Sequence, residues 1–228
     1  MPPGIGMMNQ MGFGIEILYS FVIIACSLMI YYGTRELYEL SSYKGIKYFR
    51  KAFLFFAIAY FFRSFIKFII NYFSVSRIMD FAPREFGILT LFAFMYFSSM
   101  AIFYLLYSVI WKKLDRQPNG IYLFHVFALI IAFISIILPT VGTYLILNLI
   151  LLVFAIFTVY ISKQNISKKS RGSGLYVIYI LLSVFWIFNI LDILVPSFVQ
   201  QFQLAIYLIS SGIFLTILYK VIKQTGPN

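Results

Sequence analysis

Seven long apolar runs constrain this chain more than any other feature of its sequence. They lie near residues 15–32, 52–73, 87–111, 121–139, 144–162, 175–195 and 202–222. A helix needs about 20 predominantly apolar residues to cross a hydrocarbon layer about 30 Å thick. The runs therefore predict an all-α fold: a polytopic integral membrane protein built as a bundle of seven transmembrane helices.

The composition excludes an ordinary soluble domain. The chain is 62% hydrophobic and only 11% charged, whereas soluble domains carry about 25% charged residues. Its net charge of +11 fits basic cytoplasmic loops, so no nucleic-acid partner is expected. We expect residues 1–14 to form a flexible external lead-in and residues 15–222 to form one transmembrane domain. Residues 223–228 would then be a short cytoplasmic tail.

The distribution of lysine and arginine predicts the orientation in the membrane. Only Arg77 and Arg84 lie in connections on one side. The other side collects Arg35, Lys44, Lys47, Arg50, Lys51, Lys112, Lys113, Arg116, Lys163, Lys168, Lys169, Arg171, Lys220 and Lys223. Because basic residues accumulate on the cytoplasmic side, the N-terminus is predicted outside and the C-terminus inside, in the plasma membrane.

The second run carries two cations within its apolar body. Arg63 lies about 16 Å beyond Ala52 along a helix, near the middle of the membrane. Lys67 and Asn71 follow at steps of four residues, so all three share one helix face. A charge at this depth costs at least about 2.5 kcal/mol and generally faces a bundle interior or a wet cavity.

The other polar residues within the runs are predicted to lie mainly in the outer half of the membrane. The candidate ligand-binding residues are Glu16, Arg63, Lys67, Asn71, Asn148, Asn189 and Asp192. Two interpretations stay open. Glu16 and Asp192 could pair with Arg63 and Lys67 and only fix the helix packing. Alternatively, the cations could line an outward-facing cavity for a small anionic or amphiphilic ligand.

No arrangement typical of an enzyme appears in the sequence. His125 has no second histidine nearby, and the single cysteine, Cys26, lies within an apolar run. No phosphate-binding loop, nucleophile elbow or paired-carboxylate motif is present. We therefore expect no catalytic residues, no metal site and no cofactor.

An internal repeat and two family comparisons bear on the architecture. The segments around Arg63 and Asn189 correspond at a spacing of about 126 residues, which would fit a three-plus-one-plus-three repeat with the fourth helix as a connector. The predicted topology resembles that of retinal proteins and G-protein-coupled receptors. However, the seventh run has its first lysine, Lys220, at its end, where it cannot serve as a central retinal attachment site.

These features lead us to expect a receptor-like or sensory membrane protein. A small anion channel or transporter with Arg63 and Lys67 lining the path is the alternative. An accessory subunit of a larger complex is a weaker one. The basic clusters predict contact with anionic lipid head groups at the cytoplasmic face. An acidic cytoplasmic partner protein and a homo-oligomer stay open.

Overall fold

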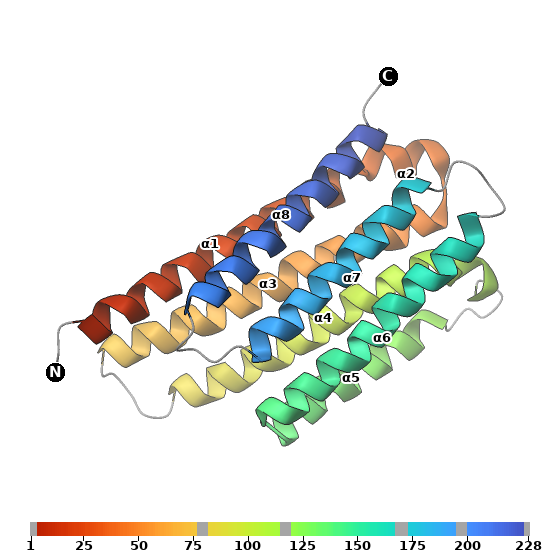
Figure 1. Cartoon of the computed structure of the whole chain (residues 1–228). Coiled ribbons are helices and arrows are strands. Elements are labelled where there is room, and N and C mark those ends of the chain that lie inside the picture. The colour runs from red at the N-terminus through yellow and green to blue at the C-terminus, as the bar shows by residue number, and fades with distance from the viewer. Residues whose placement is uncertain (1–3, 77–81, 115–119, 167–172, 195–199, 226–228) are drawn as a thin grey trace.

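The computed structural model describes residues 4–76, 82–114, 120–166, 173–194 and 200–225 (Figure 1). The regular structure in these ranges is entirely helical. The helices are α1 (Gly4–Gly33), α2 (Arg35–Ser41), α3 (Lys44–Ser76), α4 (Ala82–Leu114), α5 (Gly120–Ile137), α6 (Val141–Ile166), α7 (Ser173–Leu194) and α8 (Gln200–Thr225). The predicted runs lie within these helices, apart from residues 138–139 and residue 195, which lies outside the described residues.

Among the described residues, six helices are long and apolar enough to cross a membrane: α1, α4, α5, α6, α7 and α8. The all-helical, polytopic architecture predicted from the sequence is therefore confirmed for these six helices. Helix α3 carries the second predicted run, but only residues 52–65 and residue 68 of that run have described side chains, so the count of six does not test it.

The start of the chain differs from the sequence prediction. Residues 4–14, which were expected to belong to a lead-in, are the first part of α1. At its other end α1 stops at Gly33, and the short helix α2 follows. The Arg50 Nε donates a hydrogen bond to the Tyr31 carbonyl oxygen at 3.0 Å, and its guanidinium lies 4.9 Å from the Tyr31 ring centroid. Arg50 thus joins the last turn of α1 to α3 through a carbonyl that also accepts from the Thr34 hydroxyl at 3.4 Å.

Six helices form a closed ring in the order α1, α3, α4, α6, α7 and α8, with α8 returning to α1. Helix α5 lies outside the ring, where it packs on α4 and touches α6 (Figure 1). If α1, α3 and α4 exchange places with α6, α7 and α8 in that order, every helix keeps equivalent neighbours in the ring. A three-plus-one-plus-three repeat with α5 as the connector requires this pattern.

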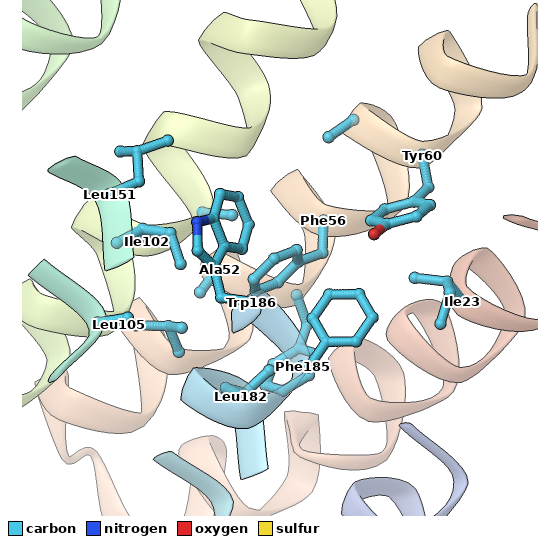
Figure 2. Packing of buried hydrophobic residues seen from close by; sticks show 14 of the residues in the cluster. Ile23, Ala52, Phe56, Tyr60, Ile102, Leu105, Leu151, Leu182, Phe185 and Trp186 are labelled. Carbon is cyan, nitrogen blue, oxygen red and sulfur yellow. The ribbon is translucent and has the colours of Figure 1, made fainter. Parts of the chain in front are cut away.

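Aromatic side chains fill the centre of the ring. Phe56 of α3, Phe185 of α7 and Phe214 of α8 are fully buried. Their ring centroids lie 6.0 Å (Phe56–Phe214), 6.4 Å (Phe56–Phe185) and 4.5 Å (Phe185–Phe214) apart. Figure 2 shows Phe56 beside Phe185 and Trp186 within this packing. These edge-on contacts hold opposite sides of the ring together.

A glycine allows the close approach of α3 to α4 near the start of α3. A Cβ atom added at Gly45 would lie 2.9 Å from the Ser108 carbonyl oxygen and 3.0 Å from the Trp111 Nε1. We therefore expect Gly45→Ala to destabilise the bundle by about 1–3 kcal/mol through overpacking. The change would be measured as a loss of free energy of unfolding in mixed micelles.

The matched control is the same substitution at Gly212 in α8. An added Cβ at Gly212 meets no atom within 4 Å, and alanine is a better helix former than glycine by up to about 1 kcal/mol. Gly212→Ala should therefore leave stability unchanged or raise it. Equal destabilisation by both variants would contradict the close α3–α4 contact at Gly45.

Candidate functional site

The candidate site is centred on Arg63 of α3, which three hydrogen-bond acceptors hold from two other helices. Its Nη1 donates to Asn189 Oδ1 at 3.1 Å. Its Nη2 donates to Asp192 Oδ2 at 2.6 Å and to Glu16 Oε1 at 3.5 Å. Of the two interpretations left open by the sequence, these contacts match the first as far as Arg63 is concerned, because Glu16 and Asp192 both pair with it. One guanidinium connects α1, α3 and α7, which suits its planar array of donors.

Two tyrosines extend this network. The Tyr60 hydroxyl donates to Asn189 Oδ1 at 2.7 Å, and it lies 3.1 Å from the Tyr19 hydroxyl. Because Tyr60 uses its proton on Asn189, Tyr19 must be the donor in the second bond. The Arg63 guanidinium lies 5.7 Å and 5.6 Å from the ring centroids of Tyr19 and Tyr60, within cation–π range. We call these six residues (Glu16, Tyr19, Tyr60, Arg63, Asn189 and Asp192) the Arg63 cluster.

The Arg63 cluster is buried, but it lies near one end of the bundle. The side chains of Arg63, Glu16 and Asp192 are only 13%, 11% and 11% exposed. Asp192 is two residues from the end of α7, and the α5–α6 turn lies at this same end (Figure 1). Ionic groups removed from water in this way are strongly coupled, since little solvent screens them.

The predicted site residues are only partly brought together. Glu16, Arg63, Asn189 and Asp192 meet in the Arg63 cluster. Asn148 does not contact Arg63: its Nδ2 donates to the Tyr144 carbonyl of its own helix, and its own carbonyl accepts from Trp186 Nε1 at 3.1 Å. The side chains of Lys67 and Asn71 lie outside the described residues.

A cavity of about 330 Å³ opens beside this end of the ring. Its lining is mostly apolar and comes from α4, α5, α6 and α7, with the residues Leu91, Ser135, Pro139, Thr140, Val141, Tyr144 and Ile193. Ile193 follows Asp192 in the chain, so the end of α7 contributes both to the cavity wall and to the Arg63 cluster.

The sequence did not single out the tyrosines of the cluster or the residues that line the cavity. Tyr19 is three residues after Glu16, and Tyr60 is three residues before Arg63. That spacing places each tyrosine on the helix face of its charged neighbour, so it was a usable signal. Leu91 and Ile193 carried no such signal, because they resemble the lipid-facing residues around them.

The remaining polar side chains of the described residues do not form a metal centre. No group of three or more His, Cys, Asp or Glu residues among them could hold a metal ion. His125 of α5 instead contacts α4, with Nδ1 2.7 Å from the Tyr96 hydroxyl and Nε2 3.5 Å from the Tyr104 hydroxyl. These bonds fix α5 on the outside of the ring.

The fold and the site together define a polytopic helical membrane protein with a buried ionic cluster inside its ring. The chain is 33% identical over 214 residues to an uncharacterized protein of Archaeoglobus fulgidus, and the aligned region covers 92% of each protein. It therefore belongs to the same family as this archaeal protein. No known family profile and no solved structure matches the chain.

Proposed function

We propose that the protein is a receptor-like membrane protein that binds an amphiphilic ligand beside the Arg63 cluster. The observation that supports this most is the cavity of about 330 Å³, whose mostly apolar wall includes Ile193, the residue that follows Asp192 in the chain. Binding sites for small molecules are commonly apolar cavities with a few polar groups that fix the ligand's orientation. An amphiphile is favoured over a simple anion, because the donors of Arg63 already have acceptors.

The proposal includes the finer topology. In this proposal α3 also crosses the membrane, which raises the number of spans from six to seven. It lies between α1 and α4 and buries Phe53, Phe56 and Tyr60. The N-terminus and the cavity face the outside of the plasma membrane, and the basic residues near α2 face the cytoplasm. There Lys44, Lys47, Lys51 and Lys112 would meet anionic lipid head groups or an acidic partner.

The test uses single-chain amphiphiles of equal chain length with anionic, neutral and cationic head groups. Binding to purified protein would be compared between wild type and Ile193→Trp, which places an indole in the cavity. We expect Ile193→Trp to weaken binding by at least about tenfold, which corresponds to about 1.4 kcal/mol. The readout is the dissociation constant from calorimetric or fluorescence titration.

Leu191→Trp is the matched control. Leu191 is on the same helix and exposed, and it does not line the cavity. The Leu191→Trp variant should bind the amphiphiles with the affinity of wild type. Unchanged affinity in Ile193→Trp, or an equal loss of affinity in both variants, would contradict the proposal.

A second candidate function, a small anion channel or carrier, is favoured by the contact between Arg63 and Asn189. These residues are 126 positions apart, which is the spacing that a three-plus-one-plus-three repeat would give to equivalent positions. Transporters built from repeats commonly place their sites between the halves. Protein in liposomes should then conduct anions, with the flux lost in Arg63→Leu. No flux from folded wild-type protein would exclude this candidate.

A further inference from the structure

Lys51, near the start of α3, holds its ammonium group over an aromatic ring of α4. Its Nζ lies 5.6 Å from the ring centroid of Tyr104, within cation–π range. Lys47 is exposed and lies one turn earlier on the same face of α3. Among the residues that the structure describes, no carboxylate pairs with Lys51. The two lysines therefore form a patch of positive charge at the seam between α3 and α4.

Hydroxyl groups from α4 lie next to this patch, where α5 packs on α4. The Tyr104 hydroxyl lies 3.5 Å from the Nε2 of His125, and the Tyr96 hydroxyl lies 2.7 Å from its Nδ1. A neutral imidazole donates through one ring nitrogen and accepts through the other. One of the two tyrosine hydroxyls therefore accepts from His125 and keeps its own proton for a further acceptor.

A stripe of half-buried aromatic rings leads from Lys51 along the seam between α3 and α4. Phe55 is one turn beyond Lys51, and its ring centroid lies 5.0 Å from that of Tyr104. The Phe97 ring is next, 5.5 Å from Phe55 and stacked on Phe62 at 5.7 Å between centroids. Lys51 and Phe62 are 11 residues apart, a rise of about 16 Å. The stripe is therefore about as long as the hydrocarbon layer of one leaflet is thick.

We infer that this surface binds an anionic phospholipid, with the phosphate at Lys47 and Lys51 and an acyl chain along Phe55, Phe97 and Phe62. Two ammonium groups complement the charge of the head group, and the tyrosine hydroxyl can donate to an ester oxygen. The inference deepens the proposed contact with anionic head groups, and it rests on the orientation proposed above. A lipid is favoured over an acidic protein, because only a lipid has a chain that follows the stripe into the membrane.

Native mass spectrometry of the full chain in detergent tests the inference with two probes of equal acyl chains, phosphatidylglycerol and phosphatidylcholine. The readout is the dissociation constant of the first bound lipid. We expect wild type to bind phosphatidylglycerol more tightly, because phosphatidylcholine carries a cation that the lysines repel. Lys51→Gln should weaken the binding of phosphatidylglycerol by about fivefold, the contribution of one lysine beside an anionic head group. It should leave the binding of phosphatidylcholine unchanged.

Lys220→Gln is the matched control. Lys220 is half-buried like Lys51, but it lies on α8, which packs against α1 and α7. The same loss of charge there should change neither affinity. The inference is overturned if wild type binds both lipids equally, a result that would leave the lysines to an acidic partner protein. Equal losses in Lys51→Gln and Lys220→Gln would also overturn it, because they would show only a general effect of net charge.

Two further variants keep the test decisive. If Lys51→Gln does not fold, Lys47→Gln at the exposed lysine takes its place, and an unchanged affinity for phosphatidylglycerol overturns the inference. Ile193→Trp should leave this affinity unchanged, because the cavity includes Pro139, beyond the end of α5, whereas His125 lies near the start of that helix. The lipid site and the proposed amphiphile cavity can therefore fail independently.

Discussion

Replacing Arg63 with leucine is expected to destabilise the folded bundle by about 3–5 kcal/mol. The substitution removes the cation that pairs with Asp192 and Glu16, and it leaves both carboxylates in a nearly dry environment. Breaking a buried ion pair from one side has an effect of this size, since the remaining charge is uncompensated. Equilibrium unfolding in mixed micelles, followed by circular dichroism, would measure the loss.

Two further variants separate this explanation from a general effect of removing an arginine. Arg35 pairs with Glu39 in α2, where the two side chains are 66% and 56% exposed, so Arg35→Leu should change stability little. Arg63→Leu combined with Asp192→Leu should recover part of the lost stability, because it removes one of the stranded charges. If Arg63→Leu unfolded at the wild-type midpoint, the ion pairs at Arg63 could not be stabilising the bundle.

Most of the architecture could be predicted from the sequence, because length and hydropathy decide which segments become membrane helices. The predicted runs fall within α1 and α3 to α8, apart from residues 138–139 and residue 195. The ends were less predictable. Residues 4–14 extend α1 because helical hydrogen bonding continues beyond the run that periodicity and hydropathy mark.

The core of the site was also predictable, since few polar residues lie deep in the apolar runs. Counting the helical rise placed Arg63 near the middle of the membrane and Glu16, Asn189 and Asp192 in its outer half, and the structure brings these four together. Depth alone could not predict rotation about the helix axis. Asn148 has a suitable depth but hydrogen-bonds within α6 and supports Trp186 of α7.

The spacing of 126 residues between similar segments was a weak sequence signal, but it matched two residues that are in contact. It aligned Arg63 with Asn189 although the two residue types differ, and these side chains meet at 3.1 Å. The aromatic packing at the centre of the ring could not be predicted from a comparable sequence pattern, because phenylalanines are abundant throughout the chain.

Replacing Phe56 with alanine is the second large effect we expect, a loss of about 3–5 kcal/mol in the free energy of unfolding. Phe56 is fully buried, and its ring lies 6.0 Å from Phe214, 6.4 Å from Phe185 and 6.3 Å from Trp186 between centroids. Figure 2 shows that Phe185 and Trp186 converge on it from α7. Truncation would open a void where α3, α7 and α8 meet, and rigid helices cannot collapse fully to fill it.

Phe61 provides the matched control for Phe56, since it is on the same helix but is 53% exposed on the outside of the bundle. Within a membrane, lipid chains can fill the space that Phe61→Ala leaves, whereas they cannot reach the centre of the ring. Packing is the main force between membrane helices, because lipid is as apolar as the side chains. Phe61→Ala should therefore unfold close to the wild-type midpoint, and Phe56→Ala well below it. Equal midpoints for the two variants would mean that the centre of the ring is not tightly packed around Phe56.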